Sequence, residues 1–462
     1  MMPSPKSAAV LRWILVSGCL IGVPGLWACS NAQGGEVKPP PSPQPVAGEQ
    51  AFPGVVGYGA GSRGGRGGRI IPVDTLADGG PGSFRACVEE RGPRTCVFRV
   101  AGVIRFTGKP PVIANPYLTI AGQTAPGGGI TIAHGGGPLG RTPLLVKGTH
   151  DIVIRHIRVR NDLIGGSREA EDSFTIESSK NVVLDHVSAS WARDELVNGY
   201  GDNDRITISN SIFAEGIPRH DKCALLASDP KGPQRLSFIG NICAHNGDRN
   251  PDLNFPPQSC VEVVNNILYN AQSEFAEIWE SFGGAPVALI GNSFVAGKNT
   301  RPETVGVARN LLGSKGAAQV YLWDNAFDGE FTHMSALLAN ALVTEPPCSG
   351  TIVAMPAKAA YTAVLRSAGA FPRDAIDRKV VADIRGRTGR IVREPGVIPP
   401  IDPGTPYPDA DGDGMDDGWE ATHSADPHRP DAWEDADGNG LANLDQFLDH
   451  LSRQLTRTGS RP

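Results

Sequence analysis

Short apolar runs rich in β-branched residues recur along the middle of the chain, and each run ends at a polar residue suited to a tight corner. Seven runs align, with their last residues 24 to 33 positions apart. These corner residues are His156, His186, Asn210, Asn241, Asn266, Asn292 and Asn325. Helical repeats of this length would need runs of roughly ten or more residues with 3.6-residue periodicity, which the segments between the corners lack. The pattern therefore predicts an all-β fold, a parallel β-helix in which corner asparagines stack as a ladder of side-chain amides.

The same strand phase extends back through residues 118–130, and proline-rich stretches mark the boundaries of the solenoid. Within the segment that follows the solenoid, residues 336–343 and 359–367 are predicted to be helical. The predicted organisation is a signal peptide over 1–28, a proline-rich tether over 29–50, a β-helix over 51–330, a capping extension over 331–394, a linker over 395–408 and a small acidic module over 409–450.

The first 28 residues have the pattern of an export signal. Lys6 and Arg12 precede an apolar run that is too short and too often interrupted by Gly and Pro for a membrane span. The run ends at Cys29, in a sequence that resembles the lipobox of bacterial lipoproteins. We therefore expect export, either with a lipid anchor at Cys29 as the only link to a membrane or as a freely secreted protein.

Composition narrows the choice of partners. Lys and Arg total 43 against 49 Asp and Glu, so the net charge of −6 gives no general attraction to nucleic acid. The 57 Gly and 39 Pro residues argue against an all-helical fold. Six cysteines lie beyond Cys29, and disulfides persist in an oxidising compartment. Cys87 and Cys96 are close enough to bridge locally, whereas the sequence leaves the pairing of Cys223, Cys243, Cys260 and Cys348 open. A monomer is expected.

Four polar residues of the solenoid recur at about one coil length. Asp172, Asn198, Lys222 and Arg249 are separated by 26, 24 and 27 positions, and Asp194 precedes Asn198 by four residues. Residues one coil apart stack on the same face, so the spacing predicts a polar line with an oxygen-rich end and a cationic end. Oxygen ligands suit a hard cation, and the Lys and Arg suit a carboxylate-bearing polymer.

Around these residues the chain resembles the pectate lyases of polysaccharide lyase family 1, over about residues 51–330. The matching segments are residues 51–61, 64–68, 80–85, 118–129 and 183–191, together with His220-Asp-Lys222 and Arg249-Asn-Pro251. The resemblance implies a right-handed parallel β-helix and calcium-dependent cleavage of polygalacturonate, or a related uronate polymer, by β-elimination. It also implies a calcium ion at Asp172, Asp194 and Asn198, substrate binding by His220, Lys222 and Arg249, and catalysis by Arg249 assisted by Lys222.

The chemistry itself leaves the base open. Elimination removes a carbon-bound proton beside a carboxylate, and calcium and Lys222 can neutralise the charge that builds up. Free guanidinium has a pKa above about 12, so Lys222, His220 and His245 are alternatives to Arg249 as the base.

Two other functions remain open at the sequence level. A β-helix hydrolase of the polygalacturonase type would need paired carboxylates, and Asp185 has no Asp-Asp partner in the solenoid. A non-catalytic carbohydrate-binding solenoid is the second rival, because Asp252 and Asn254 stand where the family commonly has a second substrate arginine.

The acidic module near the C-terminus contains a twelve-residue calcium-loop pattern from Asp409 to Glu420. Gly414 stands at the sharp turn, and the expected ligands are Asp409, Asp411, Asp413, Met415 through its carbonyl oxygen, Asp417 and Glu420. A second copy over residues 435–446 ends in Gln446, which cannot supply a bidentate carboxylate. Prolines before Asp409 exclude an entering helix. The pair therefore resembles the dockerin or thrombospondin type 3 loops appended to exported proteins.

Overall fold

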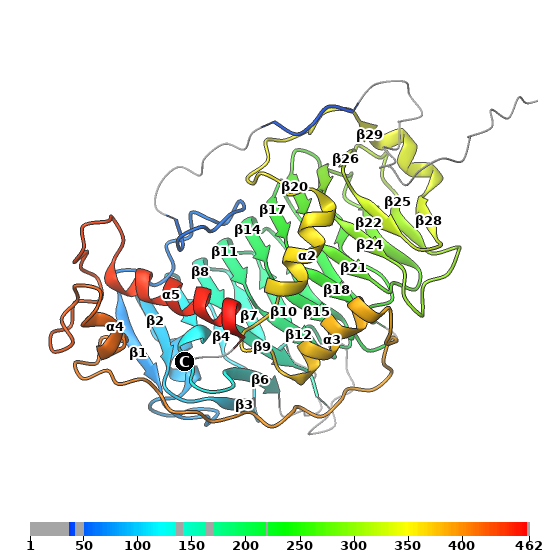
Figure 1. Ribbon diagram of the computed structural model, residues 1–462. Helices are drawn as coiled ribbons and strands as arrows, with labels where there is room; N and C mark the ends of the chain where they lie inside the picture. The colour runs from blue at the N-terminus through cyan, green and yellow to red at the C-terminus, as the bar shows by residue number, and fades with distance from the viewer. Residues whose placement is uncertain (1–36, 42–49, 135–141, 163–170, 219, 460–462) are drawn as a thin grey trace, which may run out of the picture.

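The chain winds into a solenoid of about nine coils built from three parallel sheets (Figure 1). The computed structural model describes residues 37–41, 50–134, 142–162, 171–218 and 220–459. The predicted signal peptide, Cys29 and most of the tether lie outside these ranges. Across the described ranges, each full coil contributes one strand to each sheet, and every strand pairs in parallel with the equivalent strand of the next coil. The predicted parallel β-helix is confirmed.

The strands of the described residues fall into three sheets, and chain order matches spatial order in each of them. The eleven-stranded sheet contains β1 (Arg69–Val73), β2 (Arg94–Phe98), β5 (Leu118–Ala121), β8 (His150–Arg155), β11 (Lys180–Asp185), β14 (Asp204–Ser209), β17 (Arg235–Ile239), β20 (Cys260–Val264), β23 (Pro286–Ile290), β26 (Gln319–Trp323) and β29 (Leu342–Val343). A nine-stranded sheet, called the site sheet below, contains β4 (Val112–Ile113), β7 (Leu144–Lys147), β10 (Phe174–Glu177), β13 (Glu195–Tyr200), β16 (Lys222–Ser228), β19 (Asp252–Leu253), β22 (Glu274–Glu280), β25 (Val305–Leu311) and β28 (Thr332–Met334). The other nine-stranded sheet, called the covered sheet, contains β3 (Gly102–Phe106), β6 (Ile130–His134), β9 (Ile157–Arg160), β12 (Ser188–Ser190), β15 (Ile212–Ala214), β18 (Ile242–Ala244), β21 (Ile267–Tyr269), β24 (Ser293–Val295) and β27 (Ala326–Asp328).

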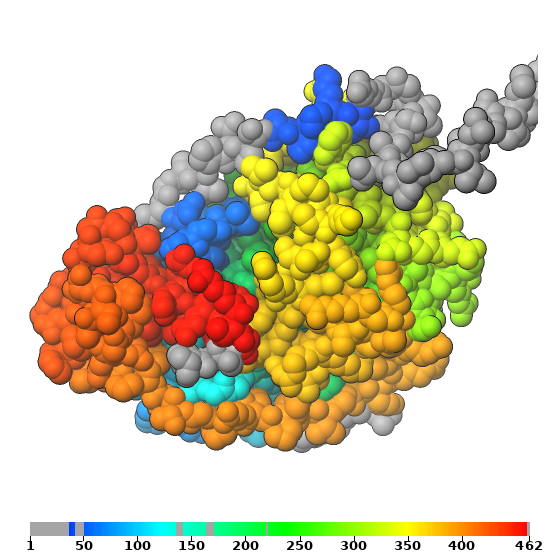
Figure 2. Space-filling view, in the orientation of Figure 1, coloured from blue at the N-terminus to red at the C-terminus, as the bar shows by residue number. Residues whose placement is uncertain are grey.

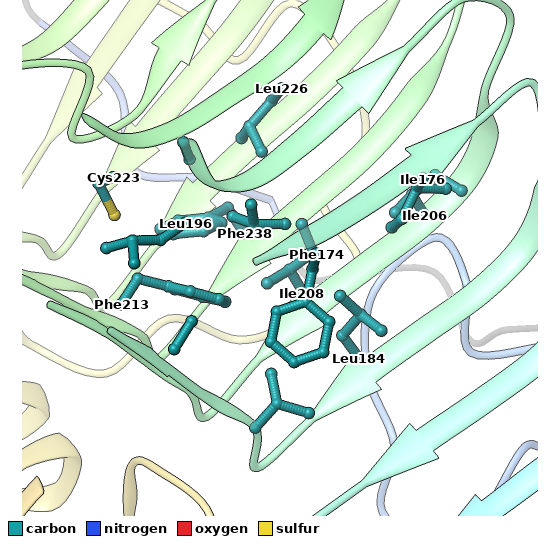
Figure 3. Close-up of a cluster of buried hydrophobic side chains, with 14 of the residues drawn as sticks. Phe174, Ile176, Leu184, Leu196, Ile206, Ile208, Phe213, Cys223, Leu226 and Phe238 are labelled. Carbon is teal, nitrogen blue, oxygen red and sulfur yellow. The ribbon is translucent and has the colours of Figure 1, made fainter. Parts of the chain in front are cut away.

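The apolar residues of the repeats fill the interior of the solenoid. Phe174 and Leu184, from neighbouring strands of two sheets, are both buried in this core. The rings of Phe213 and Phe238 lie 6.2 Å apart inside the same core (Figure 3). Because successive side chains of a strand point to opposite faces, alternate residues are left outside to carry polar groups. The packed core therefore fixes the positions of the polar side chains on the outer faces of the sheets.

The predicted amide ladder is present at the corners after the eleven-stranded sheet. The side-chain oxygen of Asn266 accepts a hydrogen bond from the backbone N–H of Asn241 at 2.8 Å, and Asn292 and Asn325 repeat this pattern at 2.9 and 3.0 Å. In the earlier coil, Ser211 replaces the asparagine and its hydroxyl accepts from the N–H of Val187. The ladder satisfies backbone donors that the interior would otherwise leave unpaired.

The alignment of the first three corner residues was wrong by one position. His156, His186 and Asn210 have φ angles of 54°, 52° and 49°, in the left-handed region. In the later coils, Gly240 and Gly291 adopt that conformation, each directly before a ladder asparagine. The corner needs two residues, one with positive φ and one that donates and accepts, and the histidines fill only the first role.

Helices cover one sheet of the solenoid. Helices α2 (Ala357–Ser367) and α3 (Ala375–Gly386) contribute Val364, Leu365 and Val380 to an apolar cluster with residues of β15, β18, β21 and β24, on the covered sheet. The helix predicted over 359–367 is confirmed as α2. The helix predicted over 336–343 is confirmed over Ala336–Ala341, as the 3-10 helix η2, whereas the last two residues form β29. Pairing of β29 with β26 extends the eleven-stranded sheet beyond the predicted boundary at residue 330.

The remaining helices are short or lie near the ends. Helix α1 (Phe84–Glu89) begins after Ser83, whose hydroxyl accepts from the N–H of Ala86, and η1 (Gly122–Thr124) follows β5. Helices α4 (Asp417–Glu420) and α5 (Asn443–Thr458) belong to the acidic module. In the described ranges no helix is both long and apolar enough to cross a membrane.

The linker and the acidic module pack against the solenoid and do not extend away from it. The N–H of Gly128 donates to the carbonyl oxygen of Asp402 at 2.8 Å, which ties the linker to the turn after η1. The module then lies against the first coils (Figure 2). Trp419 and Phe447 of the module join a cluster with Ala121 of β5. The proline-rich composition of residues 395–408 gave no indication of this docking.

Three disulfides join described residues. The predicted local bridge Cys87–Cys96 is confirmed, and the pairs that the sequence left open are Cys223–Cys243 and Cys260–Cys348. The third bridge ties the segment after β29 to β20.

Candidate functional site

Polar side chains gather on the outer face of the site sheet, across strands β13, β16, β19 and β22. Two rows of register partners run across these strands. Asn198, Leu225, Asp252 and Glu277 form one row. Glu195, Lys222 and Asp248 form the other. The single line predicted from coil spacing was therefore wrong, because Lys222 aligns with Glu195 and Asn198 aligns with Leu225.

An acidic pocket lies where β10 and β13 begin. Asp172, Asp194 and Glu195 each place one carboxylate oxygen within 4.8 Å of the others. Asp172 is buried and accepts hydrogen bonds from the Thr175 hydroxyl at 2.6 Å and from the Asn198 amide nitrogen at 3.1 Å. The backbone N–H of Glu195 donates to the same carboxylate at 3.2 Å. These contacts hold Asp172 in place at the centre of the pocket.

Burial and mutual repulsion disfavour the charged forms of these acids. Burial above all, with the neighbouring Asp194 charge, raises the pKa of Asp172 to about 6. Burial first, and the charges of Asp172 and Asp194 next, raise the pKa of Glu195 to about 9. A group of buried carboxylates with such shifts is unfavourable unless a cation compensates the charge.

The residues of the pocket fit a calcium ion. Calcium takes six to eight oxygen ligands, and the pocket offers three carboxylates. The side-chain oxygen of Asn198 is also buried and has no hydrogen-bond partner in the described ranges. An unsatisfied buried oxygen beside three carboxylates is the donor chemistry that a hard cation requires.

Glu195 was not among the metal ligands predicted from the sequence. It directly follows Asp194, and alternation along a strand would point two neighbours to opposite faces. A turn precedes β13, in which the N–H groups of Arg193 and Asp194 both donate to the carbonyl oxygen of Glu171. Both acidic side chains therefore reach the same pocket. The pair of adjacent acids was visible in the sequence, but the turn was not.

Arg249 lies beside the pocket and is held by acidic groups. Its guanidinium donates to Glu195, and its Nε lies 3.8 Å from an oxygen of Asp252. Burial alone would lower the pKa of Arg249, but Glu195, Asp252 and Asp248 outweigh burial and raise the pKa above its ordinary value. In this arrangement Arg249 is a firmly protonated cation.

Lys222 lies between Glu195 and Asp248 in the second row of register partners, and its ammonium is paired with Asp248. The ammonium is 2.5 Å from the Asp248 carboxylate, and only 14% of the side chain is exposed. Asp248, Glu274 and Glu277 form a second acidic group, with oxygens within 4.8 Å of one another. The face thus carries two acidic groups, with one basic residue paired to a member of each.

The histidines have different places. His220 is exposed, and its Nδ1 lies 3.0 Å from an Asp194 oxygen, at the rim of the pocket. His245 is fully buried after β18, where its Nδ1 accepts from the Asn270 amide. Burial lowers the pKa of His245 to about 4. His245 follows a strand of the covered sheet, which argues against it as a base for the site sheet.

We expect Glu277→Gln to stabilise the protein at neutral pH. Burial first, and the Asp248 charge next, raise the pKa of Glu277 to about 8, so the folded state keeps a proton that the unfolded chain releases above its ordinary value of 4.5. Stability from this group therefore falls as the pH rises from about 4.5 to 8. The glutamine can still accept the N–H of Arg249 and should add about 2 to 3 kcal/mol at pH 7.

Urea denaturation at pH 4 and pH 7 would measure this difference, with the exposed Glu303→Gln as the control. A gain of equal size at both pH values would show that the carboxyl of Glu277 is not kept protonated by burial.

The acidic module contains two further groups of carboxylates. Asp409, Asp411 and Asp413 form one, and Asp413, Glu420 and Asp431 form the other, again with oxygens within 4.8 Å. Asp431 was not predicted, because it lies outside the twelve-residue loop. Of the other predicted ligands, Asp417 accepts from the N–H of Ala410, and Met415 is buried with its N–H donating to Asp413. The structure brings the loop together, and the ligand roles assigned within it stay predictions.

Comparison with known proteins decides the family. Probable pectate lyase C of Aspergillus flavus is 32% identical over 417 residues, covering 87% of this chain and 94% of the relative. The chain belongs to the pectate lyase family. Probable pectate lyase C of Aspergillus oryzae matches to the same extent, and probable pectate lyase 18 of tomato (Solanum lycopersicum) is 28% identical over 190 residues, 37% of this chain. The chain is thus a polysaccharide lyase by family, and neither a hydrolase nor a non-catalytic solenoid is favoured.

Solved structures and family models add less. Jun a 1, the major allergen from cedar pollen, covers 68% of this chain and 92% of its own length with 18% identity and a TM-score of 0.48. Pectate lyase II of Xanthomonas campestris covers 69% and 98% with 16% identity and a TM-score of 0.45. No protein-family model matches the chain.

Proposed function

We propose that the chain is a calcium-dependent pectate lyase that cleaves polygalacturonate, or a closely related uronate polymer, by β-elimination. The observation that supports this most is the arrangement of Asp172, Asp194 and Glu195 around one point, with Glu195 also contacting Arg249. A metal pocket and a basic residue that share one carboxylate can act on a single substrate carboxylate and the proton beside it.

The elimination has three parts. The proton on C5 of a uronosyl residue must be removed, the electron pair must form the C4–C5 double bond, and the C4–O bond must break with protonation of the leaving oxygen. Calcium bound at the pocket would supply positive charge that neutralises the uronate carboxylate and acidifies the C5 proton. Asp172, Asp194, Glu195 and the oxygen of Asn198 would hold it.

The residues of the chain would carry the proton and position the polymer. Arg249 can accept the C5 proton only in its neutral form, and its acidic neighbours oppose that form. A cation bound to the carboxylate of Glu195 would weaken the contact between Glu195 and Arg249. The neutral form of Arg249 would then be more accessible. Lys222 and His220 would bind further carboxylates of the polymer, once Lys222 leaves Asp248.

We also propose that the protein is exported. The pattern of residues 1–28 supports this, and three disulfides are typical of an oxidising compartment. Lipidation at Cys29 and the monomeric state stay predictions.

The direct test incubates the purified protein with polygalacturonate and calcium and follows the near-UV absorbance of an unsaturated product. Absorbance that rises with calcium and stops on addition of a chelator is expected. New reducing ends without absorbance would indicate a hydrolase, and binding of the polymer without cleavage would indicate a carbohydrate-binding solenoid.

A further inference from the structure

The acidic module is in direct contact with the first two strands of the solenoid. Gly414, at the sharp turn of the loop, has a φ angle of +87°, and a Cβ atom there would lie 2.9 Å from Cγ2 of Ile70 and 3.2 Å from Cγ2 of Val97. Ile70 belongs to β1 and Val97 to β2. The module therefore touches the solenoid through the loop that carries its carboxylates.

Further contacts extend this interface from Trp433 to α5. Trp433 donates from Nε1 to the carbonyl oxygen of Gly68 at 2.8 Å. Arg66 forms an ion pair with Asp445 at 2.6 Å, and both side chains are less than one-fifth exposed. Ser452 on α5 accepts a hydrogen bond from the guanidinium of Arg155 at 2.8 Å. Figure 2 shows the module, coloured orange to red, covering this end of the molecule.

The module also buries three carboxylates of one cluster, and one of them, Glu420, has no compensating partner among the described residues, whereas Asp431 pairs with Arg429. Asp413, Glu420 and Asp431 are 3%, 0% and 3% exposed. Neither side-chain oxygen of Glu420 has a hydrogen-bond partner in the described part of the chain. One carboxylate oxygen of Asp411 is also buried there without a hydrogen-bond partner. Burying a carboxylate without a partner is unfavourable by several kcal/mol. A cation between these oxygens would satisfy Glu420 and remove the repulsion.

We infer that a calcium ion binds between Asp413, Glu420 and Asp431 and acts as a clasp that holds the C-terminal module on the first coils of the solenoid. Asp431 lies 18 residues after Asp413, so the ion joins the loop to a segment outside it. Asp431 also accepts from the Asn443 amide at the start of α5. The ion thus links the loop that contacts β1 and β2 to the helix that contacts Arg155.

This clasp is separate from the proposed lyase reaction, since its residues contact neither Lys222 nor Arg249. Arg99 of the solenoid supports the same geometry, because its guanidinium lies 4.7 Å from the ring centroid of Tyr407 and donates to the Tyr407 carbonyl oxygen. The backbone that enters the loop is therefore fixed by the solenoid before the ion binds.

Hydrogen exchange of the full-length protein, with calcium or with a chelator, tests the clasp. A background with both Asp194→Ala and Glu195→Gln removes two of the three carboxylates of the solenoid pocket, so the remaining effect of calcium is assigned to the module. Calcium at a hundred times its Kd should lower the unfolding constant of this region about a hundredfold. Chelation should therefore speed hydrogen exchange in β1 and α5 by at least about tenfold. Glu420→Gln should exchange at the same rate with and without calcium, and the exposed Asp437→Asn in the second loop should behave as the parent.

Asp431→Asn is the second variant and should also lose calcium-dependent protection, so the test does not depend on Glu420→Gln folding normally. Calcium-dependent protection that survives in both variants would overturn the proposed ligand set. Protection of β1 and α5 that is the same with and without calcium would overturn the clasp.

Calorimetry tests the coupling from the other side. Asp445→Asn weakens docking through Arg66 without touching a proposed ligand. By linkage, the undocked module binds calcium more weakly than the docked one by the factor by which calcium strengthens docking, so this variant should lower the calcium affinity by up to that factor. A calcium affinity unchanged by Asp445→Asn would mean that the ion binds without holding the module, and the clasp would be wrong.

Discussion

Arg249→Lys should lower turnover of polygalacturonate by at least about a hundredfold, the lower end of what a positioned base contributes. Lysine keeps the charge but loses the planar fork that reaches Glu195 and Asp252 together. Polymer binding should change much less, because the net charge of this face of the site sheet is the same. Steady-state kinetics that separate kcat from KM would measure the effect.

The matched control is Arg235→Lys, at a surface arginine paired with Asp204. It should leave kcat unchanged. Near-normal kcat in Arg249→Lys would remove Arg249 from the proton transfer and leave Lys222 or His220 as the base.

Glu195→Gln should weaken calcium binding at the solenoid pocket by at least about tenfold, because even changes next to metal ligands weaken metal affinity about ten- to a hundredfold. Glutamine keeps the size of the side chain but removes one of three carboxylates. Activity at limiting calcium should fall with the affinity. Calorimetry in a Glu420→Gln background would isolate the pocket from the module.

Glu177→Gln, on β10 of the same sheet and paired with Lys147, is the control and should bind calcium normally. If Glu195→Gln bound calcium as tightly as the parent, Glu195 would serve only to hold Arg249, and the ligands would be Asp172, Asp194 and Asn198 as the sequence predicted.

The coil spacing predicted the solenoid well because strand and corner repeat from coil to coil, and the amide ladder repeats in the later coils. It could not predict register along the site sheet. The corner spacings range over 24 to 33 residues, because the loops differ in length from coil to coil. A separation near 25 residues therefore does not define which residues are register partners on neighbouring strands. That is why Lys222 was placed with Asn198, whereas the strands pair it with Glu195.

The two acidic residues that the sequence did not predict were missed for the same physical reason. Glu195 reaches the pocket through a turn bonded to Glu171, and Asp431 reaches Glu420 through the packing of α5. Both depend on contacts between segments far from any motif. The docking of the linker and module had no local signal either, since an exposed proline-rich segment and a docked one have the same composition.

Two described segments from opposite halves of the sequence each lie against the far end of the solenoid, residues 37–41 against the last coils and α5 against the early coils. Near the N-terminus, the N–H of Lys38 donates to the carbonyl oxygen of Thr344, just after β29, while α5 near the C-terminus contacts β8 in the early coils. Figure 1 shows the blue segment beside β29 and the red helix across β8.

A linear array of repeats normally frays from its ends, because the terminal repeats have only one neighbour. In this chain, fraying of the last coils must displace residues 37–41, and fraying of the first coils must displace α5. Loss of either end therefore disturbs a segment from the other terminus, so the solenoid should melt as one cooperative unit. During synthesis, the first coils must also wait for the last helix before their outer surface is covered.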